Sequence, residues 1–171
     1  MSDASADAQT AAPPPAFPMR FLGQYIRDLS FEVPHAPDIF NEMRGKQPDI
    51  PVSIDTELRH IGASVFEVLL RTNVEANIGT RSVFVIELVY ASIVQIDERA
   101  IPAEQLHPVL MIEVPRLVFP FSRSIISELT SNGGFPALQL QPIDFVELYR
   151  RKFGDQPQTI ERAPAPAAAA T

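Results

Sequence analysis

The sequence predicts an α+β fold, in which the strands of one sheet come first along the chain and the helices follow them. Three observations support this prediction. Up to residue 96 the body of the chain alternates apolar and polar residues with a period of two, which is typical of half-buried strands. After residue 96 the spacing of apolar residues becomes helical. The chain has 171 residues, 46% of them hydrophobic, which suffices for one domain with its own core.

The two ends of the chain differ in composition from the part between them. Residues 1–18 are mostly Ala, Asp, Ser and Pro, and residues 154–171 end in alternating Ala and Pro followed by an Ala run. Such segments bury too little apolar surface to offset the entropy lost on ordering. We therefore expect disordered tails at 1–18 and 154–171 around one domain at 19–153. The first ten residues contain no Lys, no Arg and no apolar stretch, so a signal peptide is not expected.

The alternation predicts four strands. The first begins at Asp28 and ends before Pro34, with acidic residues on one face and apolar residues on the other. The second covers residues 52–59, and the third covers residues 65–78. A turn at 77–80 leads directly into the fourth strand at 81–96, and this short link favours an antiparallel hairpin.

The fourth predicted strand is apolar on both faces. Phe84, Ile86 and Leu88 form one face, and the other face carries valines interrupted by Glu87. One interpretation is that the strand is buried on both sides. The other is that an exposed apolar patch surrounds the charge and marks a contact with another protein. The pattern does not decide between the two.

Helices are predicted in the second half. Pro102 opens the first of them, with Ala103 to Gln105 in its first turn. A second covers 120–130, and Asn132 with the two glycines after it forms its stop. We expect Pro115 and Pro120 to break or kink whatever precedes this helix. A crossover loop at 135–141 leads to a last helix, opened by Pro142 and reaching Phe153. The second helix has an apolar stripe, suited to the core or to a subunit interface, made of Phe121, Ile125, Ile126 and Leu129.

No motif of the sequence supports catalysis. The chain has no cysteine, which excludes disulfides and thiolate metal sites. His35, His60 and His107 have no further ligand at a metal-binding spacing, so no metal site is predicted. The seven glycines form no phosphate-binding loop, and no serine lies in a nucleophile elbow. We therefore predict a non-catalytic binding protein without a cofactor. A small enzyme would need a convergent polar cluster, which is not found.

The charge balance narrows the class of partner. The chain carries 14 basic and 21 acidic residues, for a net charge of −7. Nucleic-acid binding requires a basic surface, so it is not expected, whereas an acidic surface suits basic partners or simply favours solubility. The longest apolar runs are far shorter than the ~20 residues of a membrane span, so direct membrane insertion is not expected either.

Five strings of the sequence, in order along the body from Met19 to Phe153, together resemble the SecB family of bacterial protein-export chaperones. They are Tyr25-Ile26-Arg27-Asp28-Leu29-Ser30-Phe31-Glu32-Val33-Pro34, Phe66-Glu67-Val68-Leu69-Leu70-Arg71, Phe84-Val85-Ile86-Glu87, Pro115-Arg116-Leu117-Val118-Phe119-Pro120-Phe121, and Gly134-Phe135-Pro136 with Pro142-Ile143-Asp144-Phe145. The sequence departs from the family at Ala91-Ser92, where members usually carry two glycines, and at Val114, where many carry a cysteine.

The resemblance implies a fold, an assembly and an activity. The expected fold is a four-stranded antiparallel sheet with helices packed on one side, assembling as a homotetramer that is a dimer of dimers. The expected activity is that of a cytoplasmic chaperone that holds unfolded precursor proteins without ATP and passes them to the motor SecA. A structural or assembly protein that holds no client remains the alternative.

Two sets of site residues are predicted, and the first of them is implied by the resemblance. The first set would contact the basic, zinc-bound C-terminal tail of SecA, and it consists of Asp28, Glu32, Val85 and Glu87. Asp28 and Glu32 lie four residues apart on a strand, so they share a face at ~13 Å. The alternative for these two is the solvated side of an ordinary strand. The second set would bind clients near the second strand and the crossover loop, or else belong to the core, and it consists of Val52, Ile54, Phe135, Leu138 and Leu140.

Overall fold

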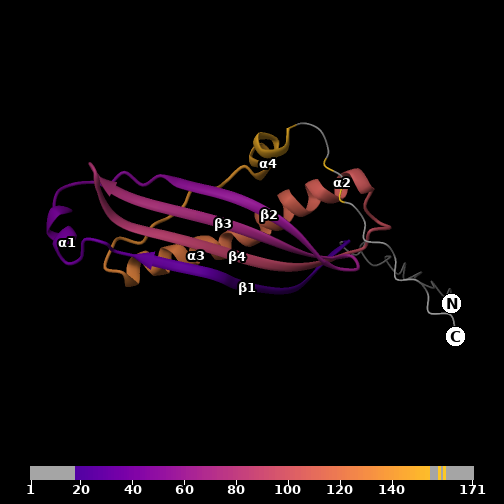
Figure 1. Cartoon of the computed structure of the whole chain (residues 1–171), viewed down its shortest axis with the longest axis horizontal. Helices are drawn as coiled ribbons and strands as arrows, with labels where there is room; N and C mark the ends of the chain where they lie inside the picture. Colours follow the sequence, from indigo (N-terminus) through magenta and orange to yellow (C-terminus); the bar gives the residue numbers. More distant parts are fainter. Residues whose placement is uncertain (1–17, 155–157, 159, 161–171) are drawn as a thin grey trace, which may run out of the picture.

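The computed structural model describes residues 18–154, 158 and 160. Most of the two predicted tails therefore lies outside the described residues; Ile160, which is described, packs against the core. A sheet comes first along the chain and a helical layer follows (Figure 1). The elements are β1 (Met19–Glu32), α1 (Asp38–Glu42), β2 (Val52–Gly62), β3 (Val65–Ile78), β4 (Arg81–Ile96), α2 (Ala103–Pro108), the π-helical segment η1 (Val109–Glu113), α3 (Val114–Asn132) and α4 (Phe145–Phe153).

The four strands form one antiparallel sheet in the order β1-β4-β3-β2, which confirms the predicted sheet. The hairpin of β3 and β4 occupies the predicted residues, and Gly79 provides the positive φ of +60° that its turn requires. Because the hairpin lies in the middle, β1 and β2 are the two edge strands. Segments far apart in the sequence, the start of β1 and the end of β4, therefore lie side by side.

β1 is longer than the sequence predicted. The prediction began at Asp28, whereas the strand begins at Met19. Its register against β4 shifts twice, between Phe21 and Gly23 and again between Ile26 and Asp28. Each shift is a β-bulge, which inserts one residue and reverses the alternation of faces. The alternation is therefore lost before Asp28, and this is why the first nine of the 14 residues of the strand were missed.

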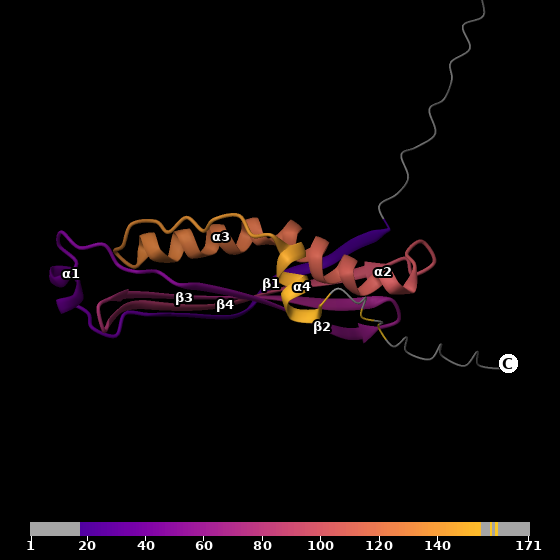
Figure 2. The same ribbon diagram turned by 90° about the horizontal axis from the view of Figure 1, so that it is seen from above.

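A continuous helical layer made of α2, η1 and α3 covers one face of the sheet (Figure 2). Pro115 and Pro120 were expected to break or kink what precedes the helix; the break is wrong, because α3 contains both prolines. Proline removes one amide donor and crowds the carbonyl four residues earlier. The π-helical segment η1 ends directly before Val114, and its wider turns relax that crowding around Pro115. Within the described residues, no helix is long and apolar enough to cross a membrane.

The core lies between the sheet and the helical layer. The larger of its two clusters joins β3 and β4 to α3 and the crossover loop, and its fully buried members include Leu70, Val74, Ile86, Leu88 and Ile126. The second cluster lies where α2 and η1 meet the other end of the sheet. The predicted stripe of α3 is divided between two environments, because Ile126 is in the core whereas Phe121 is half exposed.

α4 is held against both the sheet edge and the helical layer. The side chain of Asp144 caps its first turn by accepting hydrogen bonds from the amides of Val146 and Glu147. At its other end, Lys152 Nζ donates to Asp55 Oδ1 and to the carbonyl oxygen of Thr56 on β2. These contacts fix the end of the crossover loop that precedes α4.

Candidate functional site

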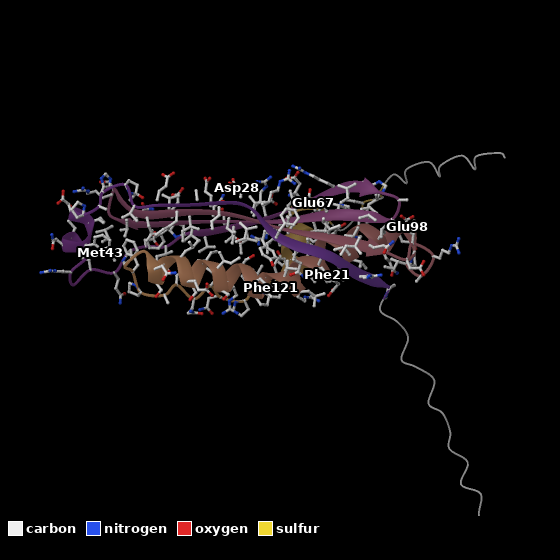
Figure 3. The ribbon with its side chains drawn as sticks, turned by 90° about the horizontal axis from the view of Figure 1, so that it is seen from below. Phe21, Asp28, Met43, Glu67, Glu98 and Phe121 are labelled. Carbon is white, nitrogen blue, oxygen red and sulfur yellow. The ribbon has the colours of Figure 1, made fainter. Side chains whose placement is uncertain are left out.

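The helix-free face of the sheet holds all four residues that the resemblance assigns to SecA. Across β1 and β4, Glu32 pairs with Val85, Ser30 with Glu87, and Asp28 with Val89. Directly paired residues point to the same face of a sheet. Asp28, Glu32, Val85 and Glu87 therefore lie together, and Figure 3 shows Asp28 on the side opposite to Phe121 of α3.

Among the described residues, the carboxylates of this surface have no cationic partner. Asp28, Glu32 and Glu87 are exposed, and no ion pair within the described part of the chain involves them. Glu75 of β3 is the other cross-strand partner of Val85, so it lies on the same face and is likewise exposed and unpaired. We call these four carboxylates, with Val85 among them, the acidic surface. Sequence reasoning missed Glu75, although the alternation of β3 placed it on a polar face.

A network of opposite charges occupies the next part of the same face. We call it the Glu67 network; it consists of Tyr25, Arg27, Glu57, Arg59, Glu67 and Arg71. Arg27 Nη1 lies 2.7 Å from each carboxylate oxygen of Glu67, and the hydroxyl of Tyr25 donates to Glu67 Oε1. Arg59 and Arg71 are held by Glu57, at 2.8 and 3.0 Å. Sequence reasoning gave no signal for this network, because its members come from three strands.

Glu67 is the buried centre of the network, since its side chain is only 7% exposed. Burial alone would raise the pKa of its carboxyl. The hydrogen bonds from Tyr25 and Arg27 outweigh burial and hold the pKa below its usual value. Glu67 is therefore a carboxylate at neutral pH, and Arg27 has a permanent partner.

A small apolar cluster lies between these charged side chains. Leu69, Val89 and Ala91 are buried although no helix covers their face. Ala91 and Leu69 lie in one cross-strand row, with Tyr25 at one end and Glu57 at the other. Sequence analysis left open whether the fourth strand is buried on both faces or exposed around Glu87, and the answer differs along the strand. β4 is buried on both faces at Val89 and Ala91, and it opens to solvent at Glu87.

Four of the five predicted client residues line an open groove between β2 and the crossover loop. Its volume is about 280 Å³, and it is lined by Ile50, Val52, Ile54, Leu138, Gln139, Leu140, Gln141 and Ile143. Val52 is 41% exposed, whereas Leu140 is buried and forms the floor. Phe135 is not part of the groove. It lies in the core, where its ring contacts those of Phe40 and Phe84.

An exposed apolar rim runs along the edge of β1 and onto α3. Its members are between 37% and 50% exposed, and they are Leu22, Ile26, Leu29, Leu117 and Phe121. Ile26 pairs with Tyr90 across the sheet, and the Tyr90 ring stacks on that of Phe121 with centroids 6.1 Å apart. The rim is therefore one continuous surface. The sequence indicated only Phe121, as part of a stripe suited to the core or a subunit interface, because the bulges conceal which β1 residues face the helices.

Comparisons with known proteins agree with this geometry. The family model described as SecB, preprotein translocase subunit SecB, matches residues 11–156. The chain is similar to the protein-export protein SecB of Paramagnetospirillum magneticum, with 50% identity over 129 residues, 75% of this chain and 81% of that protein. It is also similar to the protein-export protein SecB of Afipia carboxidovorans, with 44% identity over 95% of this chain and 98% of that protein.

A solved structure shows the same fold. It is the SecB-like chaperone of Mycobacterium tuberculosis, in complex with a ChAD peptide from the HigA1 antitoxin. The TM-score is 0.62 at 16% sequence identity, and the match covers 73% of this chain and 90% of that one. With this fold and with a family model that matches most of its length, the chain belongs to the SecB family of protein-export proteins.

Proposed function

We propose that this protein-export chaperone holds unfolded precursor proteins without ATP in the cytoplasm, and that it delivers them to SecA as a homotetramer. The observation that carries the holding function is the open groove between β2 and the crossover loop. Its walls are apolar, and strand β2 beside it is an edge strand. An extended segment of a non-native protein fits such a groove, because apolar side chains fill it and the strand edge offers backbone hydrogen bonds.

The holding function is tested by light scattering from an unfolded precursor that aggregates in the absence of ATP. The wild-type protein should suppress the scattering. Val52→Asp places a charge in the apolar groove and should abolish most of the suppression. Ile61→Asp makes the same change on the same strand at a site that does not line the groove, and it should behave like the wild type. If the wild-type protein does not slow aggregation, the chain is a structural or assembly protein instead.

The acidic surface supports docking of SecA. Its carboxylates lack cationic partners in the part of the chain that the structure describes, and they surround the partly exposed Val85. Carboxylates steer a cationic segment towards the surface, and the valine adds an apolar contact. The SecA tail that the family resemblance implies has the basic character that this surface requires.

Docking is tested by titrating SecA or its zinc-loaded tail peptide. Glu87→Lys, or Asp28→Ala with Glu32→Ala, should weaken binding and flatten its salt dependence. The assembly mass and the suppression of aggregation should remain. The assignment is wrong if docking survives these changes, or if client holding is lost together with docking.

The apolar rim supports assembly. An edge strand with exposed apolar side chains pairs readily with another chain, so β1 needs a partner that covers it. A second copy offers the same rim, and related copies meet most simply through the same patch on each. The rim lies along the edge of β1 and on the helix-covered side of the sheet. A second copy that binds there therefore leaves the acidic surface exposed. We propose that two such dimers form the tetramer.

A further inference from the structure

Arg27 and Asp28 are neighbours in β1 and carry opposite charges on the helix-free face. They differ in whether another side chain neutralises them. Asp28 is unpaired in the described part of the chain and belongs to the acidic surface. Arg27 has no cross-strand partner in β4, because it is the residue that the second bulge inserts. At a bulge two successive side chains lie on nearly the same side of the sheet. Arg27 is thus the cation adjacent in sequence to the acidic surface.

Glu67 holds this cation away from Asp28. It lies on β3, so Arg27 crosses β4 to reach it, and both carboxylate oxygens accept from Arg27 Nη1 at 2.7 Å. The cross-strand row of Glu67 contains Ile93 and Gly23, whereas the row of Asp28 contains Val89 and Arg71. The guanidinium therefore points along the sheet towards the Gly23 row. Figure 3 shows Asp28 and Glu67 on the same side of the sheet but at separate places along it.

We propose that Glu67 is a positioning residue for partner docking: it sequesters Arg27 and so leaves the acidic surface uncompensated for a cationic partner. This inference rests on the proposed docking of SecA at that surface. Glu67 itself is buried and need not touch the partner. Its role is to fix the position of the Arg27 guanidinium.

Loss of Glu67 has a specific electrostatic consequence. Arg27 is 37% exposed and long, so without its partner it turns towards the nearest free carboxylates, those of Asp28 and Glu87. A unit charge a few Å from the docking site acts within the Debye length of about 8 Å at physiological salt. Exposed charge pairs of this kind change an equilibrium by about 1.4- to fivefold. The released arginine would compete with the incoming cation for the same carboxylates.

The test is a set of titrations with the zinc-loaded SecA tail peptide at several salt concentrations. Glu67→Gln should weaken binding about fivefold and flatten the salt dependence. Glu67→Gln combined with Arg27→Gln should restore the wild-type affinity and slope, because the released cation is gone. The matched control is Glu67→Gln combined with Arg59→Gln. This control has the same net charge as the double variant that lacks Arg27. Because Arg59 is held by Glu57, its removal does not remove the released Arg27, and binding should stay weak.

A second control separates the positioning role from general charge. Glu113→Gln changes the net charge by the same amount but in the helical layer, where it releases Arg116 and leaves Arg27 in place. Binding should be nearly unchanged. Thermal unfolding and sedimentation of every variant show whether the fold and the assembly are intact. If Glu67→Gln alone does not fold, two double variants replace it, Glu67→Gln with Arg27→Gln and Glu67→Gln with Arg27→Lys. Only the variant with Arg27→Lys keeps a released cation, so only that variant should bind the peptide weakly.

Two outcomes would overturn the inference. One is that removal of Arg27 does not restore binding in the Glu67→Gln protein, since Glu67 would then act only by stabilising β1. The other is that removal of Arg59 restores binding equally well, since only net charge would then matter. Glu87→Lys is included to test the underlying proposal separately. If it leaves binding intact, the docking surface itself is wrong.

Discussion

Single residues of the crossover loop show how neighbouring apolar side chains take different roles. Phe135 is 6% exposed, and its ring contacts three other aromatic rings. Leu138, three residues later, lines the groove. The backbone around it is held by Thr130 Oγ1, which accepts a hydrogen bond from the Leu138 amide at 2.9 Å. The same loop therefore contributes to the core at its start and to the proposed client site further along.

We predict that Phe135→Ala lowers the free energy of unfolding by about 3 kcal/mol or more, because it leaves a cavity among packed rings. Val52→Ala in the groove should cost less than about 1 kcal/mol, because Val52 is already partly exposed. Denaturant titrations measure both values. Equal costs for the two variants would contradict the separation of core from groove.

At the scale of elements, the docking of α4 depends on a half-buried histidine. His107 Nδ1 of α2 is hydrogen-bonded to the hydroxyl of Tyr149 on α4 at 2.9 Å. The imidazole also packs edge-on against the Phe153 ring, with centroids 4.9 Å apart. Burial lowers the pKa of His107 from its ordinary value of 6.5. The neutral imidazole is therefore the form that joins the two helices.

This lowered pKa predicts a pH dependence. Below pH 6.5 the unfolded chain binds a proton at His107 more readily than the folded chain does. The free energy of unfolding should therefore fall as the pH drops below 6.5, and it should be at its full value above that pH. His107→Gln should show a smaller fall between pH 7 and pH 5 than the wild type. Denaturant titrations at a series of pH values measure the difference, and identical slopes would contradict the prediction.

For the whole molecule, the distribution of apolar and charged surface favours one way in which copies could meet in the proposed assembly. The apolar rim lies along β1 and α3, whereas the acidic surface faces the opposite side of the sheet. Each copy carries a formal charge of −7, so assembly must leave these charges in water. Contact through the rim meets this condition, because its members are apolar.

We predict that Phe121→Asp dissociates the assembly at micromolar concentration, because it places a charge in the middle of the rim. Ile61→Asp is the matched control, since Ile61 is 52% exposed and lies outside the rim. Sedimentation should give a smaller species for Phe121→Asp and the wild-type mass for Ile61→Asp. A wild-type protein that is a stable monomer under these conditions would refute the assembly proposal.

The sequence by itself determined the elements whose pattern is regular. The hairpin of β3 and β4 was predicted at its observed bounds, because period-two alternation continues through both strands and Gly79 allows the turn. The shared face of Asp28 and Glu32 follows from the same period. The end of α3 was predicted within two residues: the stop at Asn132 and the two glycines placed it at Thr130, and the helix ends at Asn132. These features depend on local backbone geometry, which the residues specify directly.

Only the tertiary structure decided the features that need strands to meet. The bulges of β1 have no signature in the sequence, so its first nine residues were missed. Glu75 joins the acidic surface only because β4 lies between β1 and β3. Arg27 and Glu67 are 40 residues apart and pair across an intervening strand. The physical reason is that alternation fixes the face of a side chain, whereas strand order and register decide which side chains share that face as neighbours.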